Sequence, residues 1–424
     1  LGLVTDSDLR SRLVAQGLDP ETPISEVMTA PALTVTGDRP GAEVLLDMLD
    51  HGFRHFPVLA ANGRVLGVVE DHDLVAAQGR SSFLLRRAVA RATSAEELAR
   101  AGASLRAGVI EMHHGGVAVL DVMSVYSVVA DALTRRAIEL EVAAMGVAPT
   151  PFAWLCLGSQ ARREALPSSD LDSALAWRDV ADEAPVRGYL ATLATRVTDV
   201  MAICGFAQDD HRVSAADALF SRSVSSWHTE ARRALDDPTG DKALIIASVL
   251  TDSRVVWGME FDGLLGDQFA GSLERPLLLR LLARFALSHR PPSGFARGMV
   301  VDSTGDGHAR LDLKSAAVVP IVGLARWAGL RAGVTSASTS ARLRAARDAG
   351  ILTDDDARSL LDAFELVCQL RLENQVTQME GGHAPDDLVD PSALSPLTRA
   401  YLKEAFRAVA AVQHRVANEI AWRA

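Results

Sequence analysis

Short apolar runs separated by polar turns dominate the first 80 residues of the chain. Phe56–Leu59 and Val65–Val69 are two such runs, and Asn62-Gly63 between them is a strong signal for a β-hairpin. The segment Gly2–Leu9 is echoed by Gly67–Leu74, which shares its glycine, its apolar pair and its Asp-Leu ending. The pattern predicts a small α/β module with an internal echo.

From about residue 80 onward the pattern becomes mainly helical. Apolar residues recur with helical spacing between Leu133 and Ala144, and Gly146 is expected to end that helix. Phe152–Leu157 is a compact apolar run with the length of a buried strand. Further on, Thr353 followed by three aspartates predicts a helix N-terminus, because carboxylates there interact favourably with the helix dipole. We therefore predict a helix-rich α+β chain.

The composition is that of an ordinary globular protein, with 48% hydrophobic and 23% charged residues. Its 424 residues are enough for roughly two or three domains. The net charge of −11 argues against a protein that tracks a nucleic-acid backbone, because neutralising phosphates requires a basic face. We therefore expect no nucleic-acid partner.

The number of cysteines and the distribution of apolar residues indicate where in the cell the protein is found. The three cysteines are scattered without a C-x-x-C pair, so no disulfide framework or zinc knuckle is encoded, and we expect a cytoplasmic location. Glycines and prolines break the longest segment without a charged residue, between Glu141 and Arg162, and we expect no membrane partner. Because the chain opens on Leu1 within an apparent strand, we interpret it as a piece of a longer polypeptide.

The stretch between Trp154 and Leu175 carries the candidate chemistry. An apolar strand ends in Gly158-Ser159, and Asp170 and Asp172 follow about ten residues later. Residues i and i+2 of a strand point to the same face, so these two carboxylates can converge on one divalent cation. Gly158 lets the backbone approach closely, and the amides and hydroxyl after it can hold phosphates. The stretch therefore predicts a site for a metal-bound nucleoside triphosphate.

This arrangement resembles the polymerase β-type nucleotidyltransferase superfamily. More closely, it is similar to the signal-transduction nucleotidyltransferases that carry CBS and often cAMP-binding domains, relatives of the uridylyltransferase that modifies the PII nitrogen-signalling protein. The match extends to Thr251–Gly258 and to C-terminal segments such as Leu370–Gln375. The resemblance implies that Asp170 and Asp172 are catalytic and hold Mg²⁺ or Mn²⁺. It also implies that the nucleotide is bound by Gly158, Ser159, Arg162 and Ser169.

The sequence departs from the family pattern at two places, and the basic residues near the motif and in the C-terminal half each have two alternative roles. Ala161 stands where the family usually has glycine, so the turn there is expected to be tight. The family's Pro-Cys-Pro-Gly-Gly element is replaced after Cys204, where Asp209 or Asp210 is a candidate third carboxylate. Arg162 either contacts phosphate or pairs with Glu164. The cationic side chains of the C-terminal half are expected to form helix-face salt bridges rather than to bind triphosphate, and they are Lys314, Arg326 and Arg371.

The N-terminal module looks like CBS repeats, of which the first is present only as its C-terminal end. In such modules the Thr after the strand typically contacts phosphate and the Asp three residues later contacts ribose. Thr5 and Asp8 satisfy that pattern, whereas the second copy keeps Asp73 but has Glu70 in the Thr position. The resemblance therefore implies an adenine nucleotide at Thr5, Asp8 and Asp73. We also expect homodimerisation through the CBS module, and a CBS pair that serves only this purpose is the alternative to ligand binding.

We therefore expect three parts along the chain: a partial CBS α/β module (1–78), a helical lead-in with a small mixed-sheet nucleotidyltransferase core (79–261), and a C-terminal helical domain (262–424). The expected function is Mg²⁺-dependent transfer of a nucleoside monophosphate from an NTP to a protein or small-molecule acceptor, in signal transduction, under control of the CBS module. The alternative is a catalytically silent, nucleotide-sensing scaffold.

Overall fold

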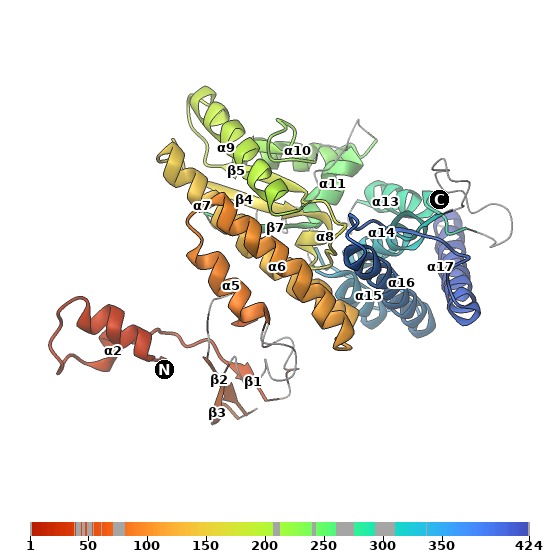
Figure 1. The fold of residues 1–424 in the computed structure, drawn as a ribbon. Helices are drawn as coiled ribbons and strands as arrows, with labels where there is room; N and C mark the ends of the chain where they lie inside the picture. The colour runs from red at the N-terminus through yellow and green to blue at the C-terminus, as the bar shows by residue number, and fades with distance from the viewer. Residues whose placement is uncertain are drawn as a thin grey trace. The chain divides into compact units, whose positions relative to one another are not determined.

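The structure is a computed structural model, and it describes residues 2–37, 39, 44, 47–48, 53, 55–60, 62–70, 81–206, 213–239, 243–259, 275–292, 310–335 and 337–422. The chain divides into two compact units, Leu1–Phe83 and Leu84–Ala424. Figure 1 shows both units, and each is described by itself. Within the described residues, no helix is both long and apolar enough to cross a membrane.

The first unit contains a three-stranded sheet of β1 (Val35–Thr36), β2 (His55–Leu59) and β3 (Val65–Glu70). β1 is parallel to β2, and β2 is antiparallel to β3. Gly63 adopts a φ of 78° in the connection between β2 and β3, so the predicted hairpin is confirmed. Three short helical segments precede the sheet: α1 (Asp6–Asp8), the π-helical turn η1 (Leu9–Val14) and α2 (Ile24–Val27).

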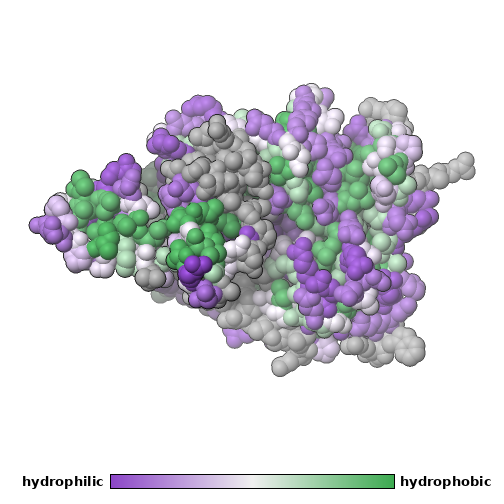
Figure 2. All heavy atoms as spheres, turned by 90° about the horizontal axis from the view of Figure 1, so that it is seen from below, coloured by the Kyte–Doolittle hydropathy of each residue, from purple (hydrophilic) through white to green (hydrophobic). Residues whose placement is uncertain are grey.

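The first unit has a small core and a large apolar surface. Phe56 of β2 is buried with Val35 and Met48. In contrast, Val65 and Leu66 of β3 are 52% and 54% exposed. Figure 2 shows hydrophobic side chains gathered on the surface of this unit. The sheet of the first unit therefore leaves apolar surface uncovered by its own described residues.

The second unit begins with helices and a four-stranded sheet (Figure 1). The strands, in the order β6-β5-β4-β7, are β4 (Phe152–Leu157), β5 (Ser173–Trp177), β6 (Ser221–Ser223) and β7 (Ser253–Gly258). β4 pairs antiparallel with β5 and β7, whereas β5 and β6 are parallel. The helices of this part are α5 (Ser81–Arg91), α6 (Ala95–His114), α7 (Val119–Met145), α8 (Gly158–Ala161), α9 (Ala184–Ile203), α10 (Val224–Asp236) and α11 (Ala243–Thr251).

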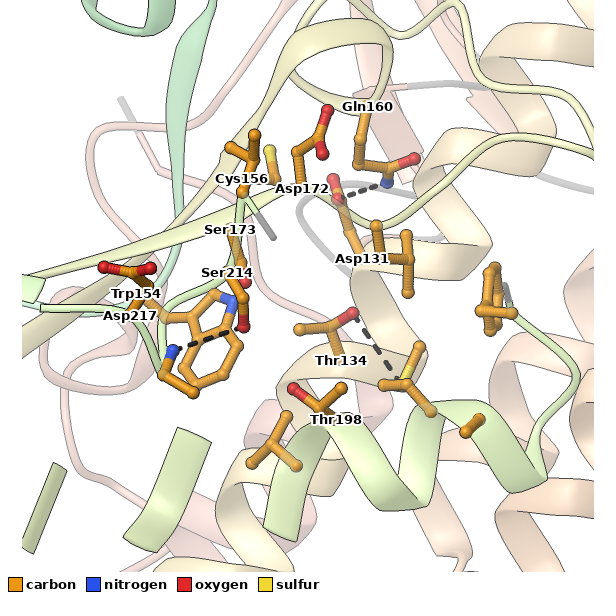
Figure 3. A pocket seen from close by; sticks show the side chains of 17 residues that line it. Asp131, Thr134, Trp154, Cys156, Gln160, Asp172, Ser173, Thr198, Ser214 and Asp217 are labelled. Atoms are coloured by element: carbon orange, nitrogen blue, oxygen red, sulfur yellow. Dashed lines mark hydrogen bonds between the residues drawn. The ribbon is translucent and has the colours of Figure 1, made fainter. Parts of the chain in front are cut away.

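The predicted strand Phe152–Leu157 is confirmed as β4, and all six of its residues are buried. The predicted helix before it is α7, which ends at Gly146 with a φ of 89°. α7 packs against α9, where Thr134 contacts the sulfur of Met201. Together with β4 and β5 these two helices line part of an open cavity of about 450 Å³, shown in Figure 3.

The C-terminal part of the second unit is almost entirely helical. Its elements are α13 (Pro276–Ser288), β8 (Leu311–Asp312), the π-helical turn η3 (Lys314–Val318), α14 (Val319–Arg331), α15 (Thr339–Asp348), α16 (Asp354–Glu380), β9 (Leu388–Val389) and α17 (Pro396–Trp422). Thr353 caps α16 as predicted, because its hydroxyl accepts from the amide of Asp356 over 3.1 Å. The helix-rich α+β fold is confirmed.

Candidate active site

The turn after β4 forms one wall of the candidate site. Gly158 has a left-handed φ of 57°, and its amide donates to the carbonyl of Asp252 over 2.9 Å. The conformation therefore favours glycine, and a Cβ atom at this position would lie 2.9 Å from Oδ2 of Asp172 and push that carboxylate away. Ala161 is accommodated as the last residue of α8, and the left-handed backbone falls instead on Arg163, at a φ of 60°.

The two predicted metal ligands lie just before β5 rather than on it. β5 begins at Ser173, so the prediction that Asp170 and Asp172 share a strand is wrong in this detail. The amide of Leu157 nevertheless donates to the carbonyl of Asp172 over 3.0 Å, which holds this segment against the end of β4. Both aspartates line one cavity of about 320 Å³, here called the first cavity.

All six predicted residues of the nucleotide site line the first cavity: Gly158, Ser159, Arg162, Ser169, Asp170 and Asp172. Lys314, at the start of η3, also lines it, and its Nζ lies 3.6 Å from Oδ2 of Asp170. The Lys314 and Asp170 side chains are 42% and 31% exposed, so both remain accessible. The hydroxyl of Ser169 accepts from the amide of Leu166 over 2.9 Å, which stabilises the loop that carries the aspartates.

Arg162 forms an ion pair with Glu164, which was one of the two alternatives for this residue. It also forms an ion pair with Asp252, which is distant in sequence. Its Nε lies 2.7 Å from Oε2 of Glu164, and its NH1 lies 2.5 Å from Oδ2 of Asp252. Asp252 also receives Arg326 and Arg342, each at 2.6 Å. These five residues, here called the arginine cluster, join the part of the second unit that contains the four-stranded sheet, here called the sheet domain, to α14 and α15.

The arginine cluster carries one net positive charge, because three guanidinium groups face two carboxylates. Burial alone would raise the pKa of Asp252, but Arg326, Arg162 and Arg342 outweigh it and hold that pKa well below its usual range. Asp252 therefore stays ionised. Arg162 and Arg326 line the first cavity, so the cluster makes its wall favourable for an anion.

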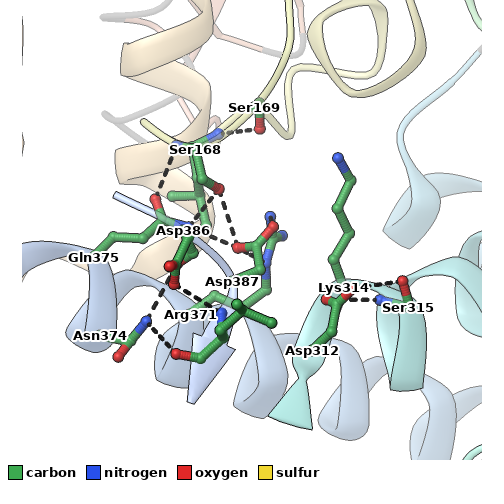
Figure 4. Close-up of polar contacts among 12 residues, drawn as sticks. Ser168, Ser169, Asp312, Lys314, Ser315, Arg371, Asn374, Gln375, Asp386 and Asp387 are labelled. Atoms are coloured by element: carbon green, nitrogen blue, oxygen red, sulfur yellow. Dashed lines mark hydrogen bonds and ion pairs between the residues drawn. The ribbon is translucent and has the colours of Figure 1, made fainter. Parts of the chain in front are cut away.

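A second polar network ties the aspartate loop to the C-terminal helices (Figure 4). Gln375 of α16 donates to Oγ of Ser168 over 2.7 Å and to Oδ1 of Asp387 over 2.8 Å. Ser168 itself donates to Asp387 over 3.0 Å, and Arg371 pairs with Asp387 at 2.8 Å. Ser168 lies two residues before Asp170, so α16 fixes the loop that presents the candidate metal ligands.

The predicted salt bridges of the C-terminal half are present, but those of Arg326 and Arg371 are buried rather than exposed on a helix face. Arg326 and Arg371 do form ion pairs, yet their side chains are only 11% and 4% exposed. They are buried contacts between segments distant in sequence, not solvated pairs on a helix face. Lys314 is the most exposed of the three and is the one next to Asp170.

The chemistry of the two aspartates suits magnesium. Mg²⁺ prefers hard oxygen ligands, and in nucleotide-dependent enzymes it is commonly held by one or two carboxylates together with substrate phosphates and waters. Asp170 and Asp172 on the wall of one cavity match that donor set. The predicted third carboxylate, Asp209 or Asp210, lies outside the described residues. Among the residues that the structure describes, no group of three His, Cys, Asp or Glu is arranged to hold a metal.

In the first unit, Thr5 and Asp8 form a reciprocal capping box. Oδ2 of Asp8 accepts from the amide and hydroxyl of Thr5 at 2.9 and 2.6 Å, and the Thr5 hydroxyl accepts from the Asp8 amide at 3.3 Å. The Thr5 hydroxyl lowers the pKa of Asp8. Asp73 lies outside the described residues.

Sequence reasoning assigned no role to Asp252, Gln375 or Asp387. Asp252 lies in a segment that matched the family, and Arg326 interrupts an apolar helix. An arginine in such surroundings indicates a buried partner, because a buried charge is stable only when paired. The partner's identity, however, depends on contacts between distant segments. Gln375 ends the family-like segment Leu370–Gln375, whereas nothing in the local sequence around Asp387 marks that residue.

Three family models match the chain. The model described as "Putative nucleotidyltransferase DUF294" matches residues 103–241, and that described as "Putative nucleotidyltransferase substrate binding domain" matches residues 276–420. A model described as "CBS domain" matches residues 24–80.

The chain is also similar to parts of longer curated proteins. A CBS domain-containing protein of Arabidopsis thaliana is 36% identical over 115 residues, which are 27% of this chain and 19% of that protein. An uncharacterised protein of Methanopyrus kandleri is 33% identical over 76 residues, which are 18% of this chain and 39% of that protein. The chain therefore covers less than half the length of either relative.

Proposed function

This chain belongs to the family of CBS-containing nucleotidyltransferases, and on that premise we propose that it transfers a nucleoside monophosphate from a Mg²⁺-bound NTP to a hydroxyl group on a protein or small molecule. The observation that carries the proposal is the first cavity. It brings Gly158, Asp170 and Asp172 together with Lys314, although Lys314 is distant in sequence.

Each part of the first cavity has a chemical role in this proposal. Asp170 and Asp172 would hold the metal ion, which supplies charge neutralisation at the reacting phosphate. The turn at Gly158 and Ser159 leaves room for the triphosphate, since no Cβ projects from Gly158. Lys314 contributes a point charge for the phosphates or for the leaving pyrophosphate.

Arg162 acts in this proposal as a fixed positive charge rather than as a mobile phosphate ligand. Two carboxylates hold its guanidinium group, and its side chain is 9% exposed. Burial alone would lower the pKa of Arg162, but Asp252 and Glu164 outweigh it and raise that pKa. Its charge is therefore permanent, and its field acts on the first cavity without a change of conformation.

The proposal includes regulation through the first unit, with an adenine nucleotide at Thr5, Asp8 and Asp73 and with homodimerisation through the CBS module. Thr5 and Asp8 bond to each other in this structure, so a ligand that contacts either group must compete with the capping box. The uncovered apolar side chains of β3 support a partner surface on this unit.

The silent scaffold remains the second candidate function because of one observation. Asp170 and Asp172 line the first cavity, but no group of three His, Cys, Asp or Glu among the described residues is arranged to hold a metal ion. A chain that binds nucleotide without transferring it would retain the first cavity and the CBS module. The two candidates differ in pyrophosphate release, which only the enzyme produces.

The experiment is incubation of the full chain with each labelled NTP, Mg²⁺ and cell extract, with label transfer and pyrophosphate release as readouts. We expect the wild type to be active and the double variant Asp170→Asn/Asp172→Asn to be inactive with an unchanged melting temperature. Asp362→Asn, an exposed position on α16, is the matched control and should retain activity. Failure of the wild type to transfer label or release pyrophosphate with any NTP would overturn the enzyme proposal and favour the scaffold.

A further inference from the structure

A second cavity, of about 450 Å³, shares one lining residue, Asp172, with the first. Asp172 lines both cavities, so the two spaces meet at this candidate metal ligand. The second cavity is built entirely from the segment between Asp131 and Asp217, and no part of the C-terminal domain lines it among the described residues. Its volume is within the usual range for small-molecule sites.

Figure 3 shows how the walls of the second cavity differ in chemistry. The indole of Trp154 lies on one wall, and Thr134 and Thr198 lie on the facing helices α7 and α9. Asp131 and Asp172 lie at one end. No Lys, Arg or His is among the described residues that line this cavity, in contrast to the first. Among the described lining residues, the cationic side chains that suit phosphate groups are therefore those of the first cavity.

On the wall that α7 and α9 form, two threonine hydroxyls present hydrogen-bond acceptors to the second cavity. The hydroxyl of Thr134 donates to the carbonyl of Ala130 over 2.9 Å, and that of Thr198 donates to Ala194 over 2.8 Å. Each hydroxyl proton is thus already used, and the oxygen lone pairs remain for a ligand. The exposed carboxylate of Asp217 adds another acceptor. The fitting ligand is rich in N–H and O–H donors and has a flat apolar face for Trp154.

We propose that the second cavity binds the nucleoside half of the NTP, with a preference for bases that carry an exocyclic amino group. This rests on the proposed function, because the phosphates of the same nucleotide occupy the first cavity. The base lies against Trp154, and its amino group and the ribose hydroxyls donate to Thr134, Thr198 and Asp217. The α-phosphate is then next to Asp172, where the two cavities meet.

The test measures binding of ATP, UTP and inorganic tripolyphosphate to the full chain in Mg²⁺ by isothermal titration calorimetry. Thr198→Met fills the cavity from α9, whereas Thr195→Met is its matched control. Thr195 is exposed on the same helix, and its hydroxyl makes the equivalent bond to the carbonyl four residues earlier, over 3.0 Å. We expect Thr198→Met to weaken ATP binding by at least ~tenfold with tripolyphosphate binding unchanged, and Thr195→Met to change neither.

The wild type supplies a second readout that does not depend on the folding of a variant. It should bind ATP about tenfold more tightly than UTP, because uracil has no exocyclic amino group to donate to the acceptors. Equal affinity for ATP and UTP, or unchanged ATP binding by Thr198→Met, would overturn the nucleoside assignment alone and favour a separate acceptor in this cavity. A wild type that binds neither ATP nor tripolyphosphate would overturn the assignment and the proposed function together.

Discussion

Replacement of Asp252 by asparagine is expected to destabilise the second unit strongly. Asp252 is 2% exposed and receives three arginines, of which Arg342 is 1% exposed. Asparagine has nearly the same shape but no charge, so three guanidinium groups would retain Glu164 as their only anionic partner within the arginine cluster. Removal of one partner from a buried ion pair costs about 3–5 kcal/mol, because the remaining charge stays desolvated.

That cost translates into a measurable shift of the melting temperature. The second unit, Leu84–Ala424, has an unfolding entropy of roughly 0.7 kcal/mol per kelvin at about 2.1 cal/mol/K per residue. A loss of about 3–5 kcal/mol therefore lowers the melting temperature by about 4–7 °C, measured by circular dichroism. The control is Asp236→Asn, which breaks a pair with Arg275 in which the Asp236 side chain is 68% exposed. Its expected shift is below about 1 °C, and equal shifts for the two variants would refute the reasoning.

The effect of Asp252→Asn also depends on pH. The pKa of Asp252 in the folded state is held below its ordinary value of 3.8 by the three arginines, although burial opposes them. A carboxylate of this kind contributes stability above its unfolded pKa, and that contribution is lost as the pH falls toward the folded pKa. The difference in melting temperature between wild type and Asp252→Asn should therefore stay constant from about pH 5 to 8 and shrink below about pH 4. A difference that grows in acid would contradict the assignment of charge.

Three further substitutions test other contacts. Gly158→Ala should lower the free energy of unfolding by about 1–2 kcal/mol and abolish Mg²⁺-dependent ATP binding. Its control is Gly350→Ala, at a similar φ of 68° but in open space, which should lower stability equally and leave ATP binding intact. Thermal melting measures the stability and calorimetry measures the binding. Gln375→Leu removes the hydrogen-bond partner of the Ser168 amide. It should lower the free energy of unfolding in urea by about 1–3 kcal/mol and raise the Mg²⁺ concentration that activity requires. Gln369→Leu, on the surface of the same helix, should have neither effect. Thr5→Val removes a helix cap and should increase hydrogen exchange of residues 6–14 by an amount equivalent to about 1 kcal/mol, with Thr5→Ser unchanged.

Local sequence signals predicted the elements that depend on local chemistry. The Asn62-Gly63 hairpin, the buried strand Phe152–Leu157 and the Thr353 cap each depend on residues that are neighbours in sequence, and all three are confirmed. The start of β5 is different, because strand pairing rather than propensity determines it. β4 pairs with β5 only as far as Cys156 and Ser173, which leaves Asp170 and Asp172 before the strand.

The candidate site divides in the same way. The glycine turn and the two aspartates lie within 15 residues and carry a recognisable pattern, so sequence reasoning placed them together. Lys314 and Asp252 come from segments far along the chain, and their contact with that pattern depends on how α14, α15 and η3 dock. For Thr5 and Asp8, by contrast, a local pattern is present but does not distinguish between two roles. Its Thr-x-x-Asp spacing also satisfies a helix cap, so the same residues fit a structural role and a binding role.

The net charge of −11 and the proposed anion site are compatible because they concern different parts of the molecule. Net charge governs solubility and long-range association, whereas a phosphate responds to the charges within a few ångströms. Around the first cavity the positive charges are Lys314, Arg162, Arg326 and Arg371, and all except Arg162 belong to the C-terminal helices. The four-stranded sheet and the segments around it contribute three carboxylates, Asp170, Asp172 and Glu164, and one arginine to the lining of this cavity. The proposed anion site therefore depends on the C-terminal helices, because they supply most of the positive charge around the first cavity.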